Sequence, residues 1–278
     1  MNYTNLQIVS NHQLTEDIFS MTVSAPGMAV LPGQFAMVYL PNGELLLPRP
    51  ISICDAAHGQ LRFVYQVVGA GTRVMSNMTP GGMVQILVPL GKGFFTTPKA
   101  DGSVGGAVPC APPTIGDAED YIPYKPARTP LNKVALVGGG IGTPPLLLLA
   151  KTLKSQGSQI DAYLGFRNTP ILTDEFKSTV DNLHIATDSG SVGHHGNVLE
   201  ILQSQLTAYD EILSCGPRPM LNALAEFAAQ RGIPCQISTE ERMACGLGTC
   251  VGCVLSVRGS YVRICTEGPV FYADDLSH

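Results

Sequence analysis

Near its end the chain reads Glu241-Arg-Met-Ala-Cys-Gly-Leu-Gly-Thr-Cys-Val-Gly-Cys253 and, ten residues later, Arg263-Ile-Cys265. The four cysteines therefore follow the spacing C-x4-C-x2-C-x11-C. Three thiolates from one tight loop and a fourth from a following segment are the ligand set of a plant-type [2Fe–2S] cluster. The glycines between them permit the positive φ angles that such a curled loop requires. The predicted ligands are Cys245, Cys250, Cys253 and Cys265.

Two other interpretations of these cysteines are weaker. A four-cysteine zinc site usually pairs one C-x2-C with a second C-x2-C, and this spacing does not. Disulfides belong to oxidising compartments, and the first residues, Met1 to Gln7, show neither the basic nor the apolar region of a secretion signal. We therefore expect an iron–sulfur protein of the cytoplasm.

Composition limits the class of protein further. The chain has 278 residues, of which 45% are hydrophobic and only 14% are charged. A surface with so few charges is typical of a cofactor-rich protein or of a subunit in a complex. The formal charge of −5, without a basic run, argues against nucleic acid as a partner. The longest apolar stretch, Pro144 to Ala150, is too short to cross a membrane.

The first hundred residues predict strands. Short runs of aromatic and branched residues alternate with Gly- and Pro-containing turns, which is typical of a β-barrel or sandwich. These runs are Phe19–Val23, Gln34–Leu40, Leu61–Val68 and Met83–Val88.

Residues 101–130 are rich in Gly and Pro and contain no Leu, which indicates a surface insertion or linker. A lid over a cofactor, with Tyr121 and Tyr124 as stacking residues, is the less favoured alternative.

From residue 131 strands alternate with helices, as in a parallel α/β sheet. The expected strands are Lys133–Val137, Ile160–Gly165, His184–Thr187 and Glu211–Cys215, with helices starting near Asn197 and Pro219. The expected architecture is thus a multidomain β plus α/β protein. It divides into a β-barrel (1–100), the insertion (101–130), a Rossmann-like nucleotide-binding domain (131–232) and a small cluster domain (233–278).

A glycine-rich turn joins the first strand of that α/β domain to its helix. Such a turn presents free backbone amides to a pyrophosphate. It is not a strict G-x-G-x-x-G, because Thr143 stands where the last glycine belongs, but its hydroxyl can serve a phosphate. The predicted nucleotide contacts are Gly138, Gly139, Gly140, Gly142 and Thr143.

A second group of residues points to a flavin. Arg49-Pro-Ile-Ser52 offers an arginine for a phosphate and a hydroxyl for a ring nitrogen, and Gly69-Ala-Gly-Thr72 offers another small-residue turn. A flavin also couples a one-electron cluster to a two-electron donor.

Cys215 opens the segment Cys215-Gly-Pro-Arg218 at the end of a strand. It either faces the nicotinamide and the flavin or is a plain buried thiol, and the residues alone leave both readings open.

In this order the motifs resemble the ferredoxin-NADP reductase superfamily. Within it the nearest likeness is to the electron-transfer subunits of type 1B dihydroorotate dehydrogenases. The most specific segments are Glu240–Cys253 and Arg263–Phe271, and the resemblance extends over nearly the whole chain.

The resemblance implies a role for each candidate residue. FAD would be held by Arg49, Pro50, Ile51, Ser52, Tyr65, Gln66, Val67, Val68, Gly71 and Thr72. Cys215, as the catalytic residue, and Gly216 would face NAD together with the glycine-rich turn, and the four cysteines would bind the cluster.

The resemblance also implies an oxidoreductase activity. Electrons would pass from the FMN of a dihydroorotate dehydrogenase partner through the [2Fe–2S] cluster and FAD to NAD⁺, in a heterotetramer of two copies of each subunit that serves pyrimidine biosynthesis. The rival is a subunit of another NAD(P)H-linked complex, of the ferredoxin-NADP reductase, sulfide dehydrogenase or hydrogenase type. A structural zinc protein is the non-enzymatic alternative. Two departures stand out: the 101–130 insertion, and an aliphatic Ile51 where plain reductases carry an aromatic residue. Arg167 after the second α/β strand leaves NAD against NADP open.

Overall fold

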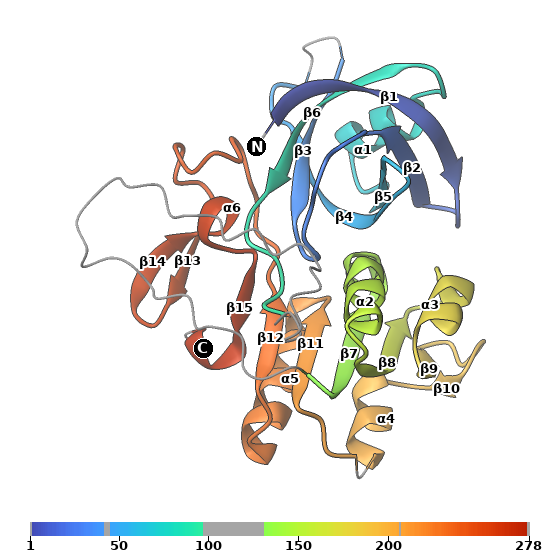
Figure 1. Ribbon diagram of the computed structural model, residues 1–278, viewed down its shortest axis with the longest axis vertical. Coiled ribbons are helices and arrows are strands. Elements are labelled where there is room, and N and C mark those ends of the chain that lie inside the picture. The colour runs from blue at the N-terminus through green and yellow to red at the C-terminus, as the bar shows by residue number, and fades with distance from the viewer. Residues whose placement is uncertain (1, 42–44, 97–130, 206, 277–278) are drawn as a thin grey trace.

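The computed structural model describes residues 2–41, 45–96, 131–205 and 207–276. The predicted insertion at 101–130, with Tyr121 and Tyr124, lies outside the described residues. Figure 1 shows a barrel, an α/β layer below it and a small C-terminal unit beside both.

Six antiparallel strands close into the barrel in the order β1-β2-β5-β4-β3-β6. Its interior is filled by alternate strand residues such as Met21, Val38, Ile53, Phe63 and Ile86, all 1% exposed or less. The elements are β1 (Asn2–Gln13), β2 (Ile18–Ser24), β3 (Phe35–Tyr39), β4 (Arg49–Ala57), β5 (Gln60–Gln66), the short helix α1 (Ala70–Ser76) and β6 (Met83–Leu90).

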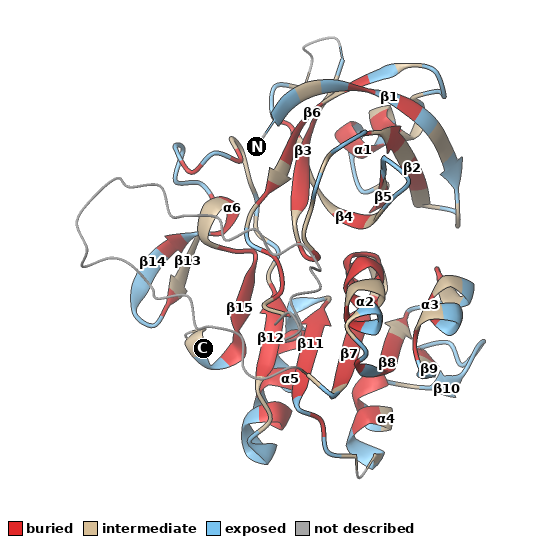
Figure 2. Ribbon diagram, viewed as in Figure 1, coloured by how far each residue is buried: buried red, intermediate tan, exposed pale blue. Residues whose placement is uncertain are grey.

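The second layer is a seven-stranded sheet with the order β10-β9-β8-β7-β11-β12-β15. All of its strand pairs are parallel except β12 with β15. Figure 2 shows its central strands buried along their length, because helices cover both faces. Its elements are β7 (Lys133–Gly139), η1 (Gly140–Gly142), α2 (Pro145–Ser155), β8 (Gln159–Phe166), α3 (Thr173–Thr179), β9 (Asn182–Thr187), β10 (His194–His195), α4 (Val198–Ser204), β11 (Glu211–Cys215), α5 (Arg218–Arg231) and β12 (Cys235–Ser238).

The C-terminal unit is a β-hairpin followed by one helical turn. Its elements are β13 (Val254–Val257), β14 (Ser260–Arg263), α6 (Ile264–Glu267), β15 (Val270–Tyr272) and η2 (Ala273–Asp275). The strands β12 and β15 belong to the seven-stranded sheet, although both lie within the expected 233–278 unit. The boundary at residue 233 therefore cuts through this sheet, and the division into domains stays a prediction.

The barrel and the α/β layer share a packed interface at helix α2. Cys54 and Val64 of the barrel lie in the same apolar cluster as Leu147 of α2, while Leu148 packs into the barrel cluster. Two ion pairs flank this contact, Lys151 with Asp55 at 2.5 Å and Arg62 with Glu175 at 3.1 Å. The two layers are thus held in one orientation.

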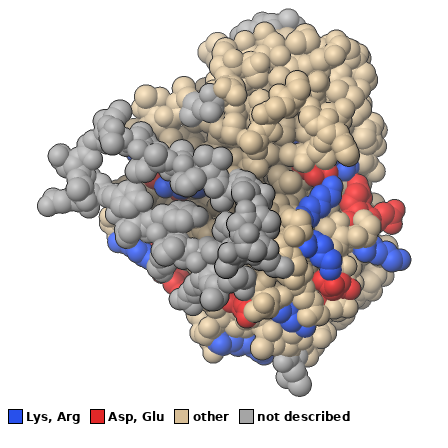
Figure 3. All heavy atoms as spheres, viewed as in Figure 1, with Lys and Arg blue, Asp and Glu red and all other residues tan. Residues whose placement is uncertain are grey.

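Charged side chains are distributed unevenly. Figure 3 shows that the visible face of the barrel is almost free of charge, whereas Lys, Arg, Asp and Glu gather over the α/β layer. Within the described residues, no helix combines the length and the hydropathy of a membrane span.

Candidate functional site

The cysteine loop runs between β12 and β13 without regular secondary structure. Gly246 and Gly248 adopt left-handed φ angles of 70° and 79°, as the sequence led us to expect, and Val251 does so as well at 54°. The fourth cysteine, Cys265, lies on α6, so the hairpin β13–β14 brings it back to the loop.

The four sulfur atoms come together as two pairs. Cys245 interacts with Cys250, and Cys253 with Cys265, whose backbone N–H donates to Cys253 Sγ at 3.4 Å. Cys253 and Cys265 are buried, Cys250 is exposed and Cys245 is half-buried. Among the described residues, no three His, Cys, Asp or Glu side chains surround one point as a single-metal site requires. Two pairs of thiols are the donor set of a cluster in which each of two irons takes two ligands.

Local hydrogen bonds act differently on the two pairs. Burial raises the pKa of Cys245, but the backbone N–H groups of Leu247 and Cys250 and the Thr249 hydroxyl outweigh it and lower this pKa to about 6. Burial, with Cys253 beside it, raises the pKa of Cys265 to about 12. A positively charged metal centre holds such thiols as thiolates, so the donor set fits an iron–sulfur cluster.

The cysteine loop packs on the outer face of the barrel. A Cβ placed on Gly246 would lie 2.5 Å from Met37 Cγ, and the residue has a left-handed φ of 70°, so only glycine allows this approach. Cys253 and Cys265 share an apolar cluster with Met37 and Leu90. Met37 pairs with Pro50 across the β3–β4 ladder. The cluster ligands therefore lie one strand away from the predicted flavin strand.

Arg49, Pro50, Ile51 and Ser52 form the start of β4, as half-buried residues. The Arg49 guanidinium donates to the Leu47 carbonyl and lies against Gly71 of α1, where a Cβ would overlap it. Two predicted flavin segments, far apart in sequence, thus meet at this arginine.

The other predicted flavin residues lie at the end of β5 and in the turn before α1. Tyr65 points into the barrel, donates to Asn11 Oδ1 at 3.1 Å, and has its pKa raised to about 12 by burial. Gln66 donates to Asp17, while Val67 is half-buried and Val68 is exposed. Thr72 Oγ1 accepts from the Val68 N–H at 3.0 Å and so shapes the turn itself. Their contacts with FAD stay a prediction.

The glycine-rich turn and the Cys215–Gly216 segment interlock at the carboxyl edge of the sheet. Cys215 pairs with Gly138 in the parallel β7–β11 ladder. A Cβ on Gly142 would lie 2.5 Å from the Cys215 carbonyl oxygen and from the Gly216 backbone, and one on Gly139 would lie 2.7 Å from Met220 Sδ. Gly140 has a left-handed φ of 53° and open space beside it. The structure thus brings together all the residues predicted to face the nucleotide.

The side chain of Thr143 shows further whether a nucleotide fits the glycine-rich turn. It is fully buried, and within the described part of the chain its Oγ1 is the one buried side-chain oxygen or nitrogen without a hydrogen-bond partner. It lies 2.9 Å from the Cβ position of Gly138, so it faces the glycine-rich turn. An unsatisfied buried hydroxyl is costly in a protein alone. This orphan atom and the glycine cradle fit a bound nucleotide.

Glu240 is a neighbour of this site that none of the sequence motifs pointed to. Burial raises the pKa of Cys215, and the Glu240 charge raises it further. Desolvation by the surrounding protein atoms raises the pKa of Glu240, although the residue remains exposed to solvent. The only signal in the sequence was its position two residues after the end of β12.

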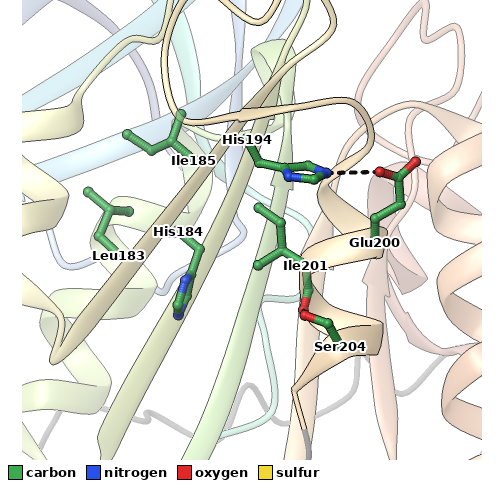
Figure 4. A pocket seen from close by; sticks show the side chains of 7 residues that line it. All are labelled: Leu183, His184, Ile185, His194, Glu200, Ile201 and Ser204. Carbon is green, nitrogen blue, oxygen red and sulfur yellow. Dashed lines mark hydrogen bonds and ion pairs between the residues drawn. The ribbon is translucent and has the colours of Figure 1, made fainter.

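A separate cavity of about 430 Å³ lies at the edge of the sheet, between β9, β10 and α4 (Figure 4). His194 Nε2 and Glu200 Oε2 meet there at 2.9 Å. None of the predicted site residues lines this cavity, so we do not assign the function to it.

Comparisons with known proteins agree with this geometry. Residues 240–277 match the family model of the iron-sulfur cluster binding domain of dihydroorotate dehydrogenase B. A protein of Clostridium perfringens, "Dihydroorotate dehydrogenase B (NAD(+)), electron transfer subunit", is 37% identical over 98% of this chain and 96% of its own length. A protein of Geobacillus thermodenitrificans with the same name is 35% identical over 98% and 97%.

Solved structures share the fold. The NADH-dependent reduced ferredoxin-NADP oxidoreductase aligns with a TM-score of 0.79 and 27% identity, over 99% of this chain and 91% of its own. Phthalate dioxygenase reductase aligns with a TM-score of 0.55 and 19% identity over 82% and 64%, which shows the fold alone. The predicted fold class and family resemblance are confirmed. With relatives this similar over nearly its full length, the chain belongs to the family of electron transfer subunits of dihydroorotate dehydrogenase B.

Proposed function

We propose that this chain is the electron-transfer subunit of an NAD⁺-linked dihydroorotate dehydrogenase and works with an FMN-containing catalytic partner. In its bound state the [2Fe–2S] cluster supplies one-electron transfer, and FAD supplies the change from one-electron transfer to hydride transfer with NAD⁺. The assembly is a heterotetramer of two copies of each subunit. Its place is the cytoplasm, where thiols stay reduced and available to a metal.

One observation carries the proposal: three of the four paired cysteines lie on a loop that packs directly on β3, next to the predicted flavin strand β4, and the fourth lies on α6 in the same apolar cluster. Cys245, Cys250, Cys253 and Cys265 bind the cluster. The outer surface of their loop carries Leu247 and Val251, 47% and 61% exposed, so the ligands lie close to a surface that a partner can reach.

The remaining residues bind and orient the two nucleotides. Arg49 supplies a fixed positive charge for a flavin phosphate, with Gly71 leaving room for it. The Gly138–Gly142 turn and Gly216 let the backbone approach NAD closely, and Thr143 offers its free hydroxyl. Burial raises the pKa of Cys215, so this residue packs at the nicotinamide end as a neutral thiol that keeps its proton. The packed α2 interface keeps water out between the two layers.

The likeness to the ferredoxin-NADP oxidoreductase favours a second candidate, a subunit of another NAD(P)H-linked complex. Affinity purification of the tagged chain from its own cells under anaerobic conditions separates the two. We expect an FMN-containing partner, FAD, about two irons per chain, and formation of orotate and NADH from dihydroorotate and NAD⁺. A different large flavoprotein partner without orotate formation would contradict the first proposal, and a colourless protein holding zinc would contradict both.

A further inference from the structure

Arg263 connects the two segments that carry the cysteines. It lies two residues before Cys265, and its Nη1 reaches the carbonyl oxygen of Gly248, in the middle of the three-cysteine loop, at 3.4 Å. Its Nη2 and Nε donate to the two carboxylate oxygens of Glu267 at 2.7 and 3.4 Å. A two-pronged arginine–carboxylate contact fixes the direction of the guanidinium.

Glu267 is in turn held by the same short segment. Its Oε2 accepts from the Arg263 backbone N–H at 2.6 Å and from the Thr266 hydroxyl at 2.8 Å. Thr266 also packs against the loop, since a Cβ on Gly248 would lie 2.9 Å from its Cγ2. Arg263, Glu267 and Thr266 thus form a polar clamp, which lies over Gly248 of the cysteine loop.

The clamp also places a positive charge against the cysteine loop. The Arg263 guanidinium reaches the Gly248 carbonyl oxygen inside this loop, and its Cδ would lie 3.8 Å from a Cβ on Gly248. The potential of an iron–sulfur cluster depends on nearby charge and on the hydrogen bonds and exposure of its sulfurs. A positive charge favours the reduced form, which carries one more electron.

We propose that Arg263 is a positioning residue that fixes Cys265 against the three-cysteine loop and sets the reduction potential of the cluster. Glu267 keeps the guanidinium in place and balances its charge. This inference deepens the proposed function and rests on cluster binding at the four cysteines.

The test compares three variants of the full chain. Arg263→Gln removes both the charge and the clamp, and the double variant Arg263→Gln with Glu267→Gln removes the clamp but restores the net charge. The matched control is Arg258→Gln. Arg258 makes an equivalent pair with Asp275 at 2.6 Å in the same C-terminal unit, between β13 and β14 and away from the cysteine loop. FAD content and NADH-dependent dye reduction show that each variant is folded.

Two readouts are followed: the rate at which a chelator removes iron, and the potential from a titration monitored by electron paramagnetic resonance. In Arg263→Gln we expect iron loss about fivefold faster, because a charge-assisted contact is gone. We also expect the equilibrium constant for reduction of the cluster to fall about tenfold. For a one-electron couple this is a shift of the reduction potential by about 59 mV to a more negative value. The double variant should lose iron as fast as Arg263→Gln does, but its cluster should have a reduction potential near that of the wild type. Arg258→Gln should change neither readout.

If Arg263→Gln has the same rate of iron loss and the same reduction potential as Arg258→Gln, the inference is overturned while the proposed function stays intact. A wild-type chain that binds no iron under reconstitution would overturn the proposed function, and this inference with it.

Discussion

At the scale of single residues, the exposure of Cys250 allows the cluster to be removed without disturbing the core. Cys250→Ser keeps the loop but replaces a soft thiolate with a hydroxyl that does not hold iron. We expect loss of the cluster's visible absorption and of dihydroorotate-linked NADH formation, with FAD content and NADH-dependent dye reduction retained. The control is Cys235→Ala, a buried thiol on β12 outside the two pairs. Orotate-linked NADH formation that persists in Cys250→Ser would contradict the assigned ligand.

Thr143 permits a second test at this scale, because a structural role and a binding role predict opposite outcomes. Its buried hydroxyl has no partner within the described part of the chain, so Thr143→Val removes no protein hydrogen bond and should leave Tm unchanged or raised. If the hydroxyl serves NAD, KM for NADH in dye reduction should rise about threefold to tenfold, the value of one hydrogen bond. Thr143→Ser should behave like the wild type in KM. A fall in Tm without a change in KM would show a purely structural residue.

At the scale of elements, β4 and α1 are tied together by one arginine and one glycine. Gly71→Ala places a methyl group where the Arg49 guanidinium lies and should push it away from the predicted phosphate position. Since a hydrogen bond to a charged group contributes about 1.5–3 kcal/mol, FAD affinity should fall about tenfold or more, measured by flavin fluorescence on dilution. In the control Gly69→Ala the new Cβ has no atom within 4 Å. Equal flavin retention in both variants would show that Arg49 does not hold the flavin.

The elements also show where sequence reasoning ends. Runs with strong hydrophobic signals were predicted as strands and largely are strands: Lys133–Val137 lies within β7, and Leu61–Val68 forms β5 as far as Gln66, with Val67 and Val68 beyond its end. β1 was missed because most of its residues are polar and face outward, and its strand character comes from pairing with both β2 and β6. The pairing of β15 with β12 was equally out of reach, since it depends on the fold of the residues between them.

At the scale of the whole molecule, the cluster site, the predicted flavin site and the predicted nucleotide site lie on neighbouring elements of the C-terminal unit, the barrel and the α/β layer. The cysteine loop packs on β3, Arg49 begins the neighbouring β4, and α2, which follows the glycine-rich turn, packs against β4 from the other layer. The order of motifs in the sequence predicted the three sites. Their spatial order follows only from closure of the barrel and the interface at α2, which no local pattern encodes. The route between cluster and nucleotide therefore depends on the packing between the parts.

That dependence can be measured on α2. Leu148 packs into the barrel cluster, on the same helix face as Lys151, whereas Leu153 points to the opposite face of the helix. Leu148→Ala should loosen the barrel against the α/β layer, and we expect flavin reduction by NADH in stopped flow to slow about tenfold, because small misplacements of reacting groups are costly. Leu153→Ala, at a fully buried position, should cost about 2–5 kcal/mol of stability but leave that rate nearly unchanged once folded protein is selected. If the two variants slowed flavin reduction equally, the effect would come from lost stability, and the α2 interface would have no special part in aligning the two nucleotide sites.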